Sequence, residues 1–305
     1  MLYFWILFNL FALGMLVLDL LVVHRRSRVV RSREALAWSA MWIVLACAFA
    51  GLLYFRQGRQ VALEFVTGYV LELSLSVDNL FIFLVIFRYF AVPEKHQRKV
   101  LFWGILGALI MRGIFILAGV GLIERFHWVL HLFGALLIYS GIRLASSGEH
   151  QVDPAKNPAV RALRRLIPVT DDFEDGHFFV RGWKGNPGLY ATPLLVVLAV
   201  IETTDVLFAV DSIPAVFAVT LNAFVVYSAN VFAILGLRSL YFAVSRLMEV
   251  FRFLHAGLAL LLILVGLKMI AANYVWVPTY LTLSVIALVL FLSIAASIAF
   301  PVKSS

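Results

Sequence analysis

Two stretches of this chain carry acidic residues inside runs that are otherwise apolar. Glu72 and Asp78 lie in the first stretch, and Glu202, Asp205 and Asp211 lie in the second. A carboxylate in the middle of a bilayer costs roughly 3 kcal/mol on insertion scales. Five unpaired carboxylates would therefore cost about 15 kcal/mol, comparable to the whole stability of a protein. Such groups indicate binding of a passing cation, uptake of protons, or pairing with buried arginines.

The ligand atoms in both stretches are those that hard cations prefer. Carboxylates, hydroxyls, one amide and backbone carbonyls are present, whereas Cys and Met are absent from both stretches. Oxygen ligands suit Mg²⁺, Ca²⁺ and Mn²⁺ better than Cu⁺ or Zn²⁺. We predict a metal site made by the five acids, with polar neighbours in support. The supporting side chains are Ser76, Asn79, Thr204 and Ser212.

Two arginines offer an alternative use for the acids. Arg112 and Arg238 lie near the middle of apolar segments, so each could neutralise a buried carboxylate. Two arginines cannot balance five acids, which favours a cation pathway with the arginines in a supporting role.

The spacing of the acids constrains the helices that carry them. Glu72 and Asp78 are six residues apart, which on an unbroken helix separates them by about 120° and about 9 Å of rise. Asp205 and Asp211 have the same spacing, whereas Glu202 and Asp205 share a helix face. Convergence on one ion therefore predicts that both helices are interrupted near the midplane.

Composition places these acids in a membrane protein. Of the 305 residues, 63% are hydrophobic and 14% are charged, whereas soluble domains average about 25% charged. We predict an all-α polytopic fold, because lipid requires that backbone hydrogen bonds be satisfied within helices. The net charge of +8 lies mainly in short loops, which argues against a nucleic-acid partner. Nine spans are expected, at about 2–23, 36–55, 62–90, 98–122, 127–146, 190–219, 222–247, 253–272 and 278–299.

The distribution of basic residues predicts the orientation. The arginine-rich run 25–33 should be cytoplasmic, which places the N-terminus outside and the C-terminus inside the plasma (inner) membrane. The outer loops then hold only four basic residues, Arg56, Arg59, Arg125 and Lys268. The single cysteine, Cys47, permits no intramolecular disulfide.

Short matches within the chain suggest a duplication. Glu124-Arg-Phe126 matches Glu249-Val-Phe251, and Gly141-Ile-Arg143 matches Gly266-Leu-Lys268, both at an offset of 125 residues. Asp78 would then correspond to Asp211 or, with a different gap, to Asp205. Because each unit has three spans, the second would be inverted, as in many secondary transporters.

The expected organisation follows from these segments. An N-terminal two-helix segment, 1–61, precedes repeat 1 at 62–146, a cytoplasmic linker at 147–189 and inverted repeat 2 at 190–272. A C-terminal helix and tail, 273–305, complete the chain. Within the linker, the stretch 159–167 could form an amphipathic helix on the membrane surface or belong to a solvated connection.

Several motifs resemble the TerC integral membrane family over about residues 35–300. They are Glu72-Leu-Ser-Leu-Ser-Val-Asp-Asn-Leu80, Phe208-Ala-Val-Asp-Ser-Ile-Pro-Ala-Val-Phe-Ala-Val-Thr220, the stretch 228–242 and the loop stretch 164–172. The resemblance implies a role in metal-ion homeostasis, with Alx-like members implicated in manganese export and the family name taken from tellurite resistance. It also implies that the five acids form the metal site.

These observations lead to one main expectation and one alternative. The main expectation is a secondary transporter that exports Mn²⁺, with Ca²⁺ or Mg²⁺ less favoured, in possible exchange for protons. The alternative is a membrane scaffold in tellurite or envelope-stress resistance that transports nothing. An enzyme is not expected, because the sequence offers no Gly-x-Ser-x-Gly or His-Glu-x-x-His motif.

Overall fold

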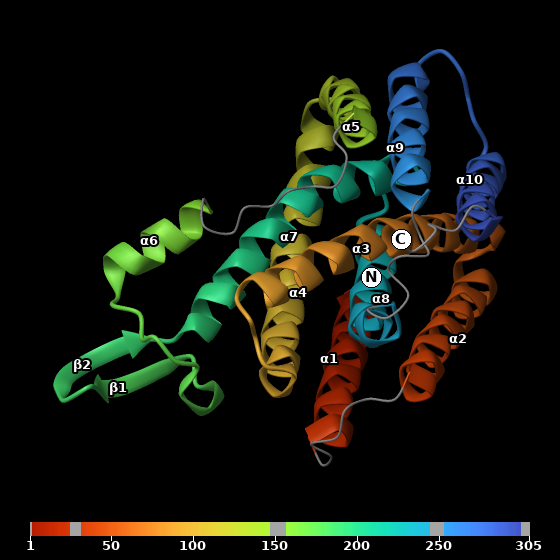
Figure 1. Cartoon of the computed structure of the whole chain (residues 1–305). Coiled ribbons are helices and arrows are strands. Elements are labelled where there is room, and N and C mark those ends of the chain that lie inside the picture. Colours follow the sequence, from red (N-terminus) through yellow and green to blue (C-terminus); the bar gives the residue numbers. More distant parts are fainter. Residues whose placement is uncertain (1, 25–31, 147–156, 245–252, 300–305) are drawn as a thin grey trace.

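The computed structural model describes residues 2–24, 32–146, 157–244 and 253–299, and these residues are mainly helical (Figure 1). A short helix, α6 (Pro158–Leu166), and a two-stranded sheet lie between the long helices. The long helices are α1 (Leu2–His24), α2 (Ser32–Gln57), α3 (Arg59–Tyr89), α4 (Glu94–Arg125), α5 (Val129–Ser146), α7 (Pro193–Phe217), α8 (Ala223–Val244), α9 (Leu254–Ala271) and α10 (Thr279–Ala299).

All nine predicted spans are helices, and their boundaries lie within about four residues of the prediction. Seven of these helices, namely all except α1 and α8, are long and apolar enough to cross a membrane. The apolar stretches of α1 and α8, Tyr3–Leu18 and Ala223–Leu237, are shorter. The fold is therefore an all-α polytopic membrane protein, and membrane crossing by α1 and α8 stays a prediction.

The predicted interruptions of α3 and α7 are wrong. Both are continuous α-helices, and hydroxyl side chains in their middle bond to the backbone of their own helix. Ser74 Oγ donates to the Val70 carbonyl at 2.6 Å, and Thr204 Oγ1 donates to the Val200 carbonyl at 2.7 Å. These side chains are thus satisfied within their own helix. Helix α3 runs at a large angle to α4 and α9 (Figure 1).

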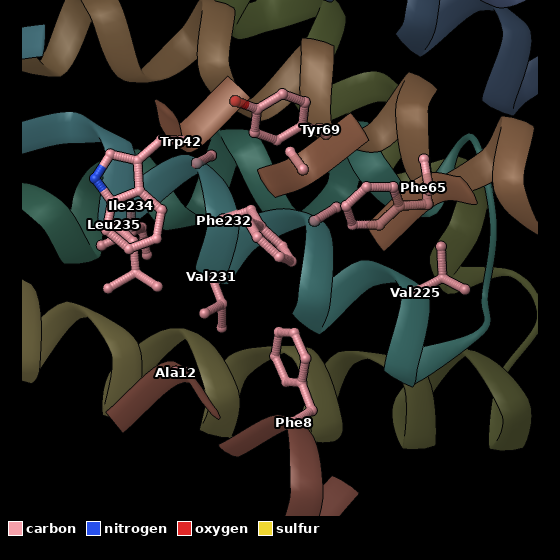
Figure 2. Packing of buried hydrophobic residues seen from close by; sticks show 14 of the residues in the cluster. Phe8, Ala12, Trp42, Phe65, Tyr69, Val225, Val231, Phe232, Ile234 and Leu235 are labelled. Carbon is pink, nitrogen blue, oxygen red and sulfur yellow. The ribbon is translucent and has the colours of Figure 1, made fainter. Parts of the chain in front are cut away.

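An aromatic cluster joins α1, α2, α3 and α8 (Figure 2). Phe65 of α3 is fully buried, stacks on Tyr69 with ring centroids 6.2 Å apart, and meets Phe232 of α8 edge-on at 5.8 Å. The rings of Phe8 of α1 and Phe232 are tilted to each other, with centroids 6.0 Å apart. Such pairs contribute about 0.5–1.5 kcal/mol each beyond area burial, so this cluster fixes α3 and α8 against each other.

A second close contact joins α5 and α9 through glycines. A methyl group at Gly134 would come within 2.9 Å of the Gly266 carbonyl oxygen, and one at Gly141 within 2.7 Å of the Ala259 carbonyl oxygen. Small residues allow such close backbone approach between helices in lipid. At the offset of 125 residues, Gly134 corresponds to Ala259 and Gly141 to Gly266, so the two contacts are reciprocal. This reciprocity agrees with an inverted repeat, which stays a prediction; the match at 249–251 lies outside the described residues.

The linker between α5 and α7 is more structured than a solvated connection. Helix α6 packs on α7 with Val160 buried, within the stretch for which an amphipathic helix was considered. Strands β1 (Phe179–Trp183) and β2 (Asn186–Ala191) pair antiparallel, and β2 runs almost directly into α7. The hairpin was not predicted, although Lys184 and Gly185 at its turn have the positive φ angles typical of tight turns.

Candidate cation site

Three charged side chains, one from each of three helices, meet in the interior of the structure. Glu72 of α3 is 0% exposed, Arg112 of α4 is 2% exposed and Asp205 of α7 is 5% exposed. Each lies near the middle of its helix, far from the helix ends. A cluster of charges at this depth is expensive in lipid and therefore marks a candidate functional site.

The guanidinium group of Arg112 binds both carboxylates at once. Its Nη1 donates to Glu72 Oε2 at 2.7 Å, its Nη2 to Asp205 Oδ1 at 3.1 Å, and its Nε to Asp205 Oδ2 at 3.3 Å. A fourth, longer contact joins Nη1 to Ser212 Oγ at 3.4 Å. The planar fork of donors on arginine suits this bridging of two acids, which a lysine could not reproduce.

The charges in this triad do not balance. One guanidinium faces two carboxylates, so the ionised triad of Glu72, Arg112 and Asp205 carries one excess negative charge. Two buried polar atoms also lack a hydrogen-bond partner among the described residues, namely Glu72 Oε1 and Asn230 Nδ2. The amide of Asn230 of α8 nevertheless lies beside the carboxylate of Glu72, so these two atoms are close to each other. The site therefore contains a polar amide and a carboxylate oxygen that Arg112 does not bind.

The helix period explains why these side chains converge. On α7, Ser212 lies two turns after Asp205 and therefore on the same face. On α4, Gly104 and Ala108 precede Arg112 at intervals of four residues, and all three are buried. A methyl group at Gly104 would lie 3.2 Å from Ile201 of α7. This stripe of small residues lets α7 approach α4 closely enough for Arg112 to reach Asp205.

Glu202 lies near the triad but not in it. Its carboxylate rests against Gly107 of α4, where any larger side chain would overlap it. Glu202 is half-buried, and within the described ranges it forms no ion pair. The neighbouring Thr203 accepts a hydrogen bond from Asn157 Nδ2 at 2.9 Å, which ties the start of α6 to the middle of α7.

Asp211 faces a different helix from Asp205. It accepts a hydrogen bond from Ser140 Oγ of α5 at 2.6 Å. The divergence follows from the continuity of α7, because six residues on an unbroken helix separate two side chains by about 120°. The structure thus brings Glu72 and Asp205 together and directs Asp211 elsewhere.

The remaining predicted residues fall into two groups. Ser76 and Asn79 are buried and lie one and two turns after Glu72, on the same face of α3. Thr204 is buried and bonded to its own helix. The side chains of Asp78 and Arg238 lie outside the described part of the structure. Among the side chains that are described, no three of His, Cys, Asp or Glu gather closely enough to hold a metal ion, so the five-acid site stays a prediction.

Two polar residues that contact predicted site residues were not singled out from the sequence. Asn230 lies in the apolar run Ser228-Ala-Asn-Val of α8, and a buried amide in such a run is a signal that could have been used. Ser140 lies in α5 and gave no such signal, because hydroxyls are common in membrane helices and usually bond to their own backbone.

Several known proteins are similar in sequence to this chain. A protein of Myxococcus xanthus named as an uncharacterized membrane protein is 46% identical over 294 residues, which cover 96% of this chain and 91% of the relative. Proteins named "Putative membrane-bound redox modulator Alx" are 44% identical in Salmonella typhi and 43% identical in Escherichia coli K12, each over 281 residues. These alignments cover 89% of this chain and 86% and 87% of the relatives. No solved structure matches the chain.

The family comparison covers most of the chain. Residues 57–304 match the profile described as "Integral membrane protein TerC family", a range that includes the triad, Glu202, Asp211 and Asn230. This chain therefore belongs to the TerC family of integral membrane proteins.

Proposed function

We propose that this protein is a secondary transporter that exports a hard divalent cation, with Mn²⁺ as the foremost candidate. The proposal depends above all on one observation: carboxylates from two helices meet in the middle of the bundle, and the described side chains supply one counter-ion for the two. An unmatched negative charge buried at this depth attracts a cation or a proton. Exchange of the metal ion for protons would then restore the charge of the site in each cycle.

The atoms around the triad favour hard cations. Glu72, Asp205 and Ser212 offer oxygen ligands, and Asn230 adds an amide beside Glu72. Hard divalent ions take six or more such ligands, including water. Two carboxylates alone do not complete that shell, so we expect the loaded state to recruit a further acid. Glu202, one turn from Asp205, is the nearest candidate along the chain.

The choice of Mn²⁺ and of the outward direction comes from the family resemblance. The printed name of several relatives is that of a redox modulator. This chain has one cysteine and so cannot act through a disulfide of its own. Removal of a redox-active metal ion from the cytoplasm would alter the redox state there, which reconciles that name with transport.

Flux measurements on the full chain in liposomes test the proposal. Uptake of Mn²⁺, Ca²⁺, Mg²⁺ and Zn²⁺ would be followed at two pH gradients for the wild type and for the Glu72→Gln and Asp205→Asn variants. Each variant leaves Arg112 facing a single carboxylate, so charge is balanced and folding should persist. Asp171→Asn is the matched control, because Asp171 is exposed and pairs with Lys184 on the hairpin.

We expect saturable Mn²⁺ flux in the wild type and in Asp171→Asn, and a loss of flux in both site variants. Equal flux in all four proteins would exclude the carboxylate site. Absence of flux in a folded wild type would instead favour the scaffold, for which substitutions in the linker rather than at Glu72 should impair stress resistance.

A further inference from the structure

We propose that Arg112 acts as a tethered cation that competes with the transported ion for Glu72 and Asp205. The inference rests on the proposed function and specifies how the affinity of the same site is set. Arg112 would occupy both carboxylates when no ion is bound and would withdraw when an ion enters. Its return would then displace the ion, so that binding is weakened and release is accelerated.

Sterics require the two cations to exclude each other. Arg112 Nη1 lies 2.7 Å from Glu72 Oε2, and Nη2 lies 3.1 Å from Asp205 Oδ1. Hard divalent ions bind carboxylate oxygens at about 2.0–2.6 Å. An ion that coordinates these two oxygens would therefore occupy the space that the guanidinium group now fills. Charge repulsion at such short range acts in the same direction.

The structure contains an acceptor to which the guanidinium group can retreat. Nη1 already contacts Ser212 Oγ at 3.4 Å, which is longer than a good hydrogen bond. Ser212 lies two turns from Asp205 on the same face of α7, about 10 Å further along the helix. When the guanidinium group withdraws from Asp205 and Glu72, Ser212 Oγ is thus an acceptor that it already touches.

Glu72 also has an oxygen that Arg112 does not bind. Arg112 Nη1 donates to Glu72 Oε2, whereas among the described residues the buried Glu72 Oε1 has no partner within full hydrogen-bond geometry. The amide of Asn230 of α8 lies beside this carboxylate. An ion that displaces Arg112 would therefore find both oxygens of Glu72 available, with a polar amide next to them.

Transport kinetics of arginine variants test this inference. Mn²⁺ flux into liposomes would be measured for the wild type, Arg112→Lys, Arg112→Gln and the control Arg125→Gln. Arg125 is exposed in the last turn of the same helix. We expect the Mn²⁺ concentration for half-maximal flux to fall about tenfold in Arg112→Gln, within the range typical of coupled sites. The maximal rate should fall as well, because the ion is no longer displaced.

Arg112→Lys should shift both quantities in the same direction but less, since a single ammonium group cannot bridge two carboxylates. If Arg112→Gln fails to fold, the half-maximal Mn²⁺ concentration of Arg112→Lys still tests the inference. A half-maximal concentration that is unchanged or raised in folded Arg112 variants would overturn the inference while leaving the transport function intact. A folded wild type without Mn²⁺ flux would overturn both.

Discussion

The triad and the crossing of α5 and α9 both hold helices together, but they do so through different interactions. Helices in lipid gain little from apolar burial against each other, so they associate through close packing or polar contacts. At the crossing, Gly134 and Gly266 bring two backbones together without any charge. At the triad, Arg112 holds α3 and α7 through charge, and it is the one counter-ion that the described residues offer to two carboxylates. The first arrangement serves stability, and for the second we propose a cation-binding role.

The largest expected effect on stability is at the centre of the triad. Arg112→Gln should lower the free energy of unfolding by about 3–5 kcal/mol, because two buried carboxylates lose their only described counter-ion. Unfolding in mixed micelles, with Arg125→Gln as control, measures the difference. Equal stability of the two variants would show that the triad does not hold α3 and α7 together.

Added side-chain volume at the crossing of α5 and α9 should lower the stability of the protein. Gly266→Val should cost about 1–3 kcal/mol, because even a methyl group there would come within 2.6 Å of the Gly134 carbonyl oxygen. Gly121→Val is the matched control, since nothing lies within 4 Å of a methyl group at that position of α4. If the two variants have the same free energy of unfolding in the same micelles, the close glycine contact does not contribute to stability.

The hydrogen bond that joins α5 to α7 should contribute less to stability than either of these contacts. Ser140 of α5 donates to Asp211 of α7, and Ser140→Ala should cost about 1 kcal/mol, the usual value of one hydrogen bond. The control is Ser284→Ala, an exposed serine that bonds to its own helix. A loss of stability no larger than that of the control would mean that Asp211 does not depend on Ser140.

Glu72→Gln should have the smallest effect on stability. The substitution removes the unmatched charge and leaves Arg112 and Asp205 as a balanced pair, so the free energy of unfolding should change by less than about 1 kcal/mol. A loss comparable to that of Arg112→Gln would show that both carboxylates are structural and would contradict the contrast between the two regions.

The sequence predicted the helices better than the site. Runs of about twenty apolar residues between basic loops are enough to locate each helix, and no tertiary information is needed. The acids and Arg112 were recognised for the same reason, since charges in such runs are rare. Their spacing in the sequence did not predict which side chain each of them contacts, because those contacts depend on the packing of helices that are distant in the sequence.

The predicted interruptions show why that gap arises. We required Glu72 and Asp78, and likewise Asp205 and Asp211, to face one ion, and an unbroken helix forbids this. The structure keeps both helices intact, and their hydroxyls bond to the backbone of their own helix. As a result, Asp205 faces Arg112 and Asp211 faces Ser140. The hairpin was missed because its short strands lie within a polar linker without strong alternation.

Binding of Mn²⁺ to the purified protein tests the central claim most directly. The paramagnetic resonance signal of free Mn²⁺ would be titrated with the wild type, Glu72→Gln, Asp205→Asn and the control Asp171→Asn. We predict saturable loss of the free signal with the wild type and the control, and little or none with the two site variants. Equal binding by all four folded proteins would contradict a cation site at Glu72 and Asp205.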